Sequence, residues 1–103
     1  MDDATIEKEV IAKGLTAPRT TLDDLNRNIK TIEIVKHTTA VGQVLRWAVI
    51  TTISGFAVTG KPSCAVSHEN DDEELGSEIA VDNARNEMWA LMSYHLACKI
   101  AEA

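Results

Sequence analysis

Residues 44–60 of the 103-residue chain read VLRWAVITTISGFAVTG, and this stretch decides the fold class. Valine, isoleucine and threonine dominate it, and their branched side chains favour extended strands. Ser54-Gly55 interrupts the run, and glycine supplies the positive backbone angle that a tight hairpin turn needs. We therefore predict two antiparallel strands, at about 44–53 and 56–60, joined by a two-residue hairpin turn.

A third strand is predicted upstream of this hairpin, at about 31–39, with Gly42 marking the turn between them. The order of strands and turns predicts a three-stranded antiparallel meander. The central strand is apolar on both faces, whereas a sheet with one face in water normally alternates more cleanly. Either the short helices of the chain cover the second face or a second subunit does, and we expect some self-association.

Two short helices are predicted before the sheet. The first spans about 3–13, where apolar residues recur at helical spacing, and Gly14 stands where a helix would end. The second spans about 22–30, and Thr21 with an acid three residues later forms a capping signal for it.

A long C-terminal helix is predicted at about 70–101, with Asn70 as its cap and Glu73 at the third position. Gly76 inside this helix indicates close packing on the sheet. The apolar stripe drifts around the helix axis, which predicts a kink or two ends that pack on different surfaces. The fold class is therefore α+β in a single domain, 1–103: a three-stranded antiparallel meander packed against the long C-terminal helix, with two short N-terminal helices.

The negative charge of the chain is concentrated in one segment. The chain has 16 acidic and 10 basic residues, a net charge of −6, and residues 69–87 alone hold eight acids and one base. The remainder is therefore nearly neutral. A surface of this sign repels a phosphate backbone, which argues against direct nucleic-acid binding. The segment is either a solvated helix start, favoured by the helix dipole, or a face that binds a protein or mimics a nucleic acid.

We predict a partner-binding surface on this acidic segment and on the aromatic residues that follow it. Trp89 and Tyr94 are alternatively core residues, whose polar tips would then need hydrogen-bond partners. The predicted surface comprises Glu69, Asp71, Asp72, Glu73, Glu74, Glu78, Trp89 and Tyr94.

The sequence carries no motif for catalysis, cofactor binding or metal binding. Its glycines are isolated, so none forms a phosphate-cradling loop. Cys64 and His68 lie four residues apart, with His37, His95 and Cys98 elsewhere, but this spacing matches no zinc motif. We therefore expect a protein that is not an enzyme and that holds no cofactor and no metal.

Export and membrane signals are also missing from the sequence. Met1-Asp2-Asp3 lacks the basic-then-apolar order of a signal peptide, and no apolar run is long enough for a membrane span. We expect a cytoplasmic protein that does not enter a membrane and whose two cysteines are free thiols.

Two stretches of the chain resemble a known family when they are taken together. The first is KGLTAPR at residues 13–19, followed by the second short helix. The second, from Gly55 to Tyr94, combines a Gly-Phe hairpin, a Gly-x-x-x-Cys segment and an acidic helix start that leads to a tryptophan and a tyrosine. They resemble a family of small tailed-phage and prophage proteins named after the forty-ninth gene product of coliphage N-four and a gene of a Shigella phage. The resemblance covers about residues 6–97, although His68 stands where the family usually has proline.

The resemblance implies a phage-encoded accessory protein that acts in the bacterial cytoplasm. We expect it to bind and inhibit a host or anti-phage defence protein, for example as an anti-CRISPR or similar counter-defence factor. One alternative is an oligomeric binder of a small ligand or nucleotide signal, with Arg19, Arg46 and Lys61 as its phosphate contacts. Another alternative is a minor virion or assembly protein.

Overall fold

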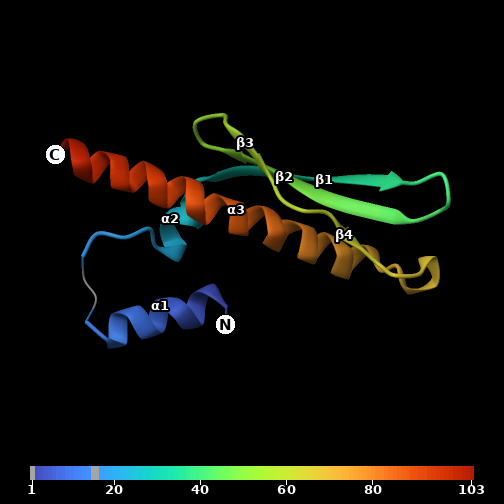
Figure 1. The fold of residues 1–103 in the computed structure, drawn as a ribbon, viewed down its shortest axis with the longest axis horizontal. Helices are drawn as coiled ribbons and strands as arrows, with labels where there is room; N and C mark the ends of the chain where they lie inside the picture. The colour runs from blue at the N-terminus through green and yellow to red at the C-terminus, as the bar shows by residue number, and fades with distance from the viewer. Residues whose placement is uncertain (1, 15–16) are drawn as a thin grey trace.

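The computed structural model describes residues 2–14 and 17–103. The predicted α+β class is confirmed: an antiparallel sheet packs against one long C-terminal helix, with two short helices before the sheet (Figure 1). In chain order the elements are α1 (Asp3–Ala12), α2 (Leu22–Arg27), β1 (Ile29–Thr38), β2 (Val44–Thr52), β3 (Ala57–Thr59), β4 (Ser63–Cys64), the 3-10 turn η1 (His68–Asn70) and α3 (Glu73–Glu102).

Strand β2 is the centre of the sheet. It pairs with β1 along one edge and with β3 and β4 along the other, and every pairing is antiparallel. The first three strands form the predicted meander. The stretch after β3 returns to the sheet, where Ser63 and Cys64 pair with Arg46 and Leu45 of β2.

Both hairpins close with a three-residue loop, so the prediction of a two-residue turn at Ser54-Gly55 is wrong. The Thr52 N–H donates to the Phe56 carbonyl and the Gly55 N–H donates to the Thr52 carbonyl, each at 2.9 Å. Gly55 has φ of +90°, and Gly42, at the same place in the β1–β2 loop, has φ of +91°. A turn that ends in a left-handed residue builds such loops, which explains glycine at both positions.

Helix α3 approaches one face of the sheet closely because small residues line the contact. A Cβ at Gly60 would overlap the backbone of Asn83 and Ala84. A Cβ at Gly76 would lie 3.0 Å from Nη1 of Arg46, so this glycine allows close packing on the sheet as predicted. The buried core cluster comprises Leu25, Ala48, Ile50, Val58, Ala80, Ala84 and Met88.

The cap of α3 differs from the prediction. Its N-cap is Asp72, whose side chain accepts a hydrogen bond from the Leu75 N–H at 2.9 Å, whereas Asn70 lies in η1. The physical reason is Asp71, which is extended in backbone conformation and paired with Arg46, so the helix begins only after it. The predicted cap of α2 at Thr21 is confirmed, with both hydrogen bonds of a capping box present.

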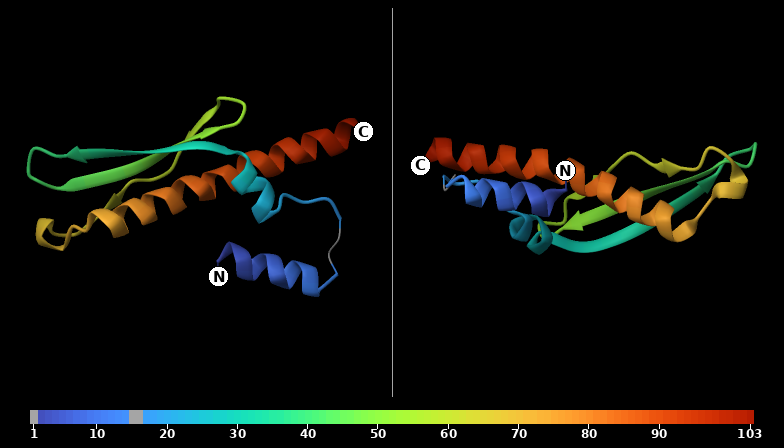
Figure 2. Two further views of the ribbon diagram at one scale, coloured as in Figure 1. Left: turned by 180° about the vertical axis from the view of Figure 1, so that it is seen from behind. Right: turned by 90° about the horizontal axis from the view of Figure 1, so that it is seen from below.

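The two halves of α3 pack on different surfaces, which confirms one of the two alternatives drawn from its drifting apolar stripe. Its N-terminal half lies along the sheet, whereas its C-terminal half extends past the sheet (Figure 1). Helix α2 contacts this second half, and α1 contacts α2 (Figure 2). In the described part of the chain, no helix combines the length and the apolar character that crossing a membrane requires.

The second face of the sheet is not covered by α1 or α2, which lie beside α3 (Figure 2). Burial along β2 alternates: the residues that face α3 are buried, and Leu45, Trp47 and Val49 on the other face are only half-buried. The alternative that the short helices cover this face is therefore wrong. Ile53, predicted as the last residue of the central strand, lies in the hairpin loop and is exposed.

Candidate functional site

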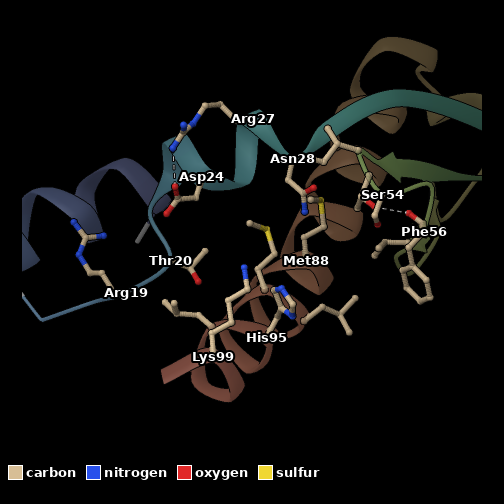
Figure 3. Close-up of a pocket in the computed structure, with 16 residues that line it drawn as sticks. Arg19, Thr20, Asp24, Arg27, Asn28, Ser54, Phe56, Met88, His95 and Lys99 are labelled. Carbon is tan, nitrogen blue, oxygen red and sulfur yellow. Dashed lines mark hydrogen bonds and ion pairs between the residues drawn. The ribbon is translucent and has the colours of Figure 1, made fainter. Parts of the chain in front are cut away.

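A groove of about 690 Å³ lies between α2, the β2–β3 hairpin and the C-terminal half of α3 (Figure 3). This volume is within the range of about 300–1,000 Å³ that small-molecule sites occupy. The groove exists because α3 continues past the sheet, so that the inner side of its last turns faces α2 and the hairpin instead of a strand. Much of its wall is apolar, with Val58, Met88, Leu91, Met92 and Leu96.

Basic side chains gather around this apolar wall. His95 and Lys99 lie one turn apart on α3 and project into the groove from the same side (Figure 3). Arg27 contributes from α2 and Arg19 from the segment before it, while Asp24 is the acidic residue among the lining side chains. The groove therefore combines an apolar surface with an excess of basic groups, although the chain as a whole is acidic.

The two arginines of the groove are already paired with carboxylates. Arg27 contacts Asp23 at 2.9 Å and Asp24 at 2.8 Å, and Arg19 contacts Glu7 of α1 at 3.1 Å. A hydrogen bond from the Thr21 backbone N–H holds the pKa of Asp24 below its ordinary value, so this carboxylate is ionised at neutral pH. These pairs orient the arginines and neutralise much of their charge.

Lys99 differs from the arginines in its pairing. Among residues 2–14 and 17–103, no ion pair involves Lys99 or His95. Lys99 therefore brings an uncompensated positive charge to the groove. An ammonium beside an apolar wall suits a ligand that has one flat or apolar part and one anionic part.

The structure divides the predicted partner-binding surface into separate groups. Asp71 forms a two-pronged contact with Arg46 at 2.6 and 2.9 Å, and these hydrogen bonds hold the pKa of Asp71 below its ordinary value. Asp72 caps α3. The four acids that remain exposed and without an ion pair among the described residues are Glu69, Glu73, Glu74 and Glu78, around the N-terminal end of α3.

The two aromatic residues of that predicted surface lie further along α3. Trp89 is half-buried, and its Nε1–H donates to the Asp3 carboxylate of α1 at 3.1 Å, which satisfies its polar tip. Tyr94 is 73% exposed. Sixteen residues separate it from Glu78, about 24 Å along the helix axis. The structure therefore does not bring the aromatic and acidic members together.

The three predicted phosphate contacts are also distributed over the molecule. Arg19 lines the groove. Arg46 is buried beneath Gly76 and is occupied by Asp71, so it offers nothing to a ligand. Lys61 lies exposed in the link between β3 and β4.

Cysteine and histidine residues form no metal site in the described ranges. No group of three His, Cys, Asp or Glu side chains there lies close enough together to hold a metal ion. Cys64 and Cys98 are both free.

Sequence reasoning missed Arg27 and Lys99, which the structure places at the groove. One signal was readable: Met88, Met92 and Lys99 recur at helical spacing on one side of α3. Such a stripe predicts only that this side of α3 contacts another part of the protein or a ligand. The position of α2 and of the hairpin opposite it depends on tertiary packing.

A comparison with protein families identifies a relationship over nearly the whole chain. The model described as "Phage protein (N4 Gp49/phage Sf6 gene 66) family" matches residues 3–100. No curated protein and no solved structure matches the chain.

Proposed function

Because the chain belongs to that family of phage proteins, we propose that it acts in the bacterial cytoplasm as a non-catalytic binder of a small anionic ligand of the nucleotide class. The proposed site is the groove beside the C-terminal half of α3. The observation that carries the proposal is the position of the uncompensated Lys99 against the apolar wall of a groove of about 690 Å³.

The lining of the groove matches the two parts of a nucleotide. Met88 and Met92 offer adaptable apolar surface against which a flat base can pack. Lys99 and His95 lie on the same side of α3 and can donate hydrogen bonds to phosphate oxygens. Arg27 adds a guanidinium that can exchange one of its exposed contacts, with Asp23 or Asp24, for a phosphate. A protein of this kind acts by lowering the free concentration of its ligand and needs no catalytic group.

Isothermal titration calorimetry with a panel of linear and cyclic mono- and dinucleotides tests this proposal. Binding of at least one nucleotide is expected, and Lys99→Ala should weaken it roughly ten- to hundredfold, the effect of losing a hydrogen bond to a charged group. The matched control is Lys61→Ala, which removes an exposed lysine that does not line the groove. It should bind like the wild type.

Two results would overturn the proposal. One is the lack of any heat of binding or thermal shift across the panel. The other is equal weakening by Lys99→Ala and Lys61→Ala, because general electrostatic attraction would then explain the binding.

A second candidate function uses the opposite end of α3, where Glu69, Glu73, Glu74 and Glu78 are exposed. This acidic end is the proposed contact for a basic surface of a host or defence protein, which the phage protein would inhibit. The supporting observation is that, among the described residues, none of these four carboxylates is used in an ion pair.

A pull-down from host lysate tests this second candidate. The variant should replace Glu73, Glu74 and Glu78 by glutamine and keep Asp71 and Asp72, which the fold itself uses. Loss of a specific captured protein with the variant supports the acidic end as a contact surface. Capture of the same proteins by both chains counts against it.

A further inference from the structure

We propose that strand β1 pairs with β1 of a second copy of this chain, so that two sheets join into one across a two-fold axis. The first observation is an open edge. Strand β1 pairs with β2 along one side, and within residues 2–14 and 17–103 no strand pairs with its other side. From Lys30 to Thr38 every residue is exposed.

The phase of the β1–β2 ladder shows which backbone groups are free. The Thr39 N–H donates to the Gln43 carbonyl at 2.8 Å, which makes these residues a hydrogen-bonded pair. Hydrogen-bonded and non-hydrogen-bonded pairs alternate along an antiparallel ladder. Therefore Ile32, Ile34 and Lys36 direct their N–H and C=O groups away from β2, ready to pair with another strand.

The open edge exposes aliphatic side chains on both sides of the sheet. Ile32 is 43% exposed and Ile34 is 40% exposed, and both lie on the α3 side because they pair with Ile50 and Ala48. Val35, on the other side, is 37% exposed. Long edge strands that stand alone are normally protected by proline, bulges or inward-pointing charges. Strand β1 has an irregularity near Ile29 and Lys36 on the α3 side, but it has no proline and exposes two isoleucines between these points.

The strand is complementary to itself in one register. After the irregularity near Ile29, the regular ladder runs from Thr31 to the Thr39 pair, and its midpoint is Val35. A two-fold axis at Val35 sets Glu33 opposite His37 of the second copy, twice. An acid then faces a basic side chain in each pair, the arrangement that favours cross-strand contacts.

The same register also gives Lys36 a neighbour that it can pack against without burying its charge. Lys36 faces Ile34 of the second copy, so its aliphatic stem covers the isoleucine while its ammonium stays in water. A two-fold at Glu33 would instead set that carboxylate against itself, and one at Lys36 would set two ammonium groups together. A two-fold at Ile34 would leave Glu33 opposite Val35. Charge complementarity therefore selects the axis at Val35 and selects a second copy as the occupant.

The first experiment uses disulfide trapping in a chain that carries Cys64→Ser and Cys98→Ala. In the proposed register Val35 meets itself as a non-hydrogen-bonded pair, with Cα atoms about 4.5 Å apart, a separation that a disulfide can bridge. Val35→Cys should therefore oxidise to a dimer of twice the 11.2 kDa chain. Thr31→Cys, on the same side of the strand, meets Thr39 of the second copy and should form no covalent dimer.

The second experiment uses the outward direction of the Lys36 N–H. Lys36→Pro removes this donor without removing a β1–β2 hydrogen bond, so the sheet should fold while the edge no longer pairs. Sedimentation should show a dimer for the wild type and for Lys36→Thr, and a monomer for Lys36→Pro, with the same far-ultraviolet circular dichroism for all three. A monomeric wild type would refute the proposal. A wild-type dimer in which Val35→Cys does not cross-link would also refute the proposal, because the two copies would then meet at a different contact.

This interface does not depend on the proposed ligand. Ile32, Ile34 and Lys36 do not line the groove. Failure of the cross-link therefore leaves the calorimetric test of the groove unaffected, and failure of nucleotide binding leaves the test of the dimer unaffected.

Discussion

Replacing Gly60 by alanine tests the close contact between the sheet and α3 that sets the position of the groove. The added methyl group would lie within 3.0 Å of the Asn83 carbonyl group and the Ala84 nitrogen, with the Asn83 oxygen at 2.6 Å. These are backbone atoms of a helix, so they cannot move aside as a side chain would. Relief requires the whole helix to move away from the sheet.

The size of the effect follows from that movement. Ordinary contact needs about 3.4 Å, so the helix must retreat by about 1 Å. A gap of this size forfeits about a quarter to a half of the dispersion attraction between facing atoms. The buried cluster that includes Ala80, Ala84 and Met88 loses contact as a result. Overpacking typically costs 1–3 kcal/mol, and we expect about 3 kcal/mol here because backbone clashes cannot relax locally.

Thermal unfolding followed by circular dichroism measures this cost. A loss of about 3 kcal/mol lowers the melting temperature of a chain of this size by roughly 12–24 °C. The comparison variant is Gly55→Ala, which has nothing within 4 Å of the new Cβ and carries only the strain of φ at +90°. It should cost about 1 kcal/mol.

A rescue experiment separates a backbone clash from ordinary side-chain crowding. Adding Ala84→Gly to Gly60→Ala should not restore stability, because the overlapping atoms belong to the helix backbone and not to the Ala84 methyl group. The reasoning is refuted if Gly60→Ala melts within about 4 °C of the wild type, or if the second substitution recovers most of the loss.

Three further predictions concern side chains at the start of α3 and on it. Asp71→Asn should destabilise the fold by leaving Arg46 buried with a neutral partner. Hydrogen bonds from Arg46 are the main reason that the pKa of Asp71 is lowered in the folded protein. The stabilisation that the Asp71 carboxylate gives the fold is therefore present above its ordinary pKa of 3.8 and is lost as the pH falls through its pKa in the folded protein. The difference in urea midpoint between Asp71→Asn and the wild type should shrink over that fall in pH. Asp72→Ala should cost about 1 kcal/mol through loss of the α3 cap, and urea unfolding should show no such cost for Asp72→Ser. Trp89→Phe should release α1, with faster hydrogen exchange over residues 3–12 and unchanged exchange in β2; equal exchange in α1 would show that the Asp3 contact does not hold it.

Local signals predicted the parts of the fold that depend on local chemistry. The Thr21 capping box and the left-handed glycines at the hairpins are properties of three or four neighbouring residues, so one sequence suffices to find them. The cap of α3 could not be found in this way. Asn70 and Asp72 are both good caps, and the choice between them depends on Arg46 holding Asp71, a contact across 25 residues.

The groove could not be predicted from local sequence either, because its lining residues are far apart in the chain. Its basic residues come from the segment before α2, from α2 itself and from the last turns of α3, and no local pattern relates Arg19 to Lys99. The acidic segment was easier to notice because its members are consecutive. Yet part of that segment serves the fold, since Asp71 pairs with Arg46 and Asp72 caps the helix. The sequence therefore predicted a binding surface on the consecutive acids and not the groove, whose lining residues come together only in the folded chain.

The net charge of −6 is not an obstacle to an anionic ligand, because charge is separated along α3. The exposed acids of the predicted surface end at Glu78, but Asp82 and Glu87 are further exposed acids on α3, and the basic groups of the groove on this helix begin at His95. Seventeen residues of helix place Glu78 about 26 Å from His95, whereas eight residues place Glu87 about 12 Å from it along the axis. The screening length at physiological ionic strength is about 8 Å, so repulsion from Glu78 is almost fully screened at the groove and repulsion from Glu87 is largely screened. An anion there responds mainly to Lys99 and its neighbours. Lowering the ionic strength should therefore strengthen nucleotide binding if the groove is the site, whereas dominance of the net charge would weaken it.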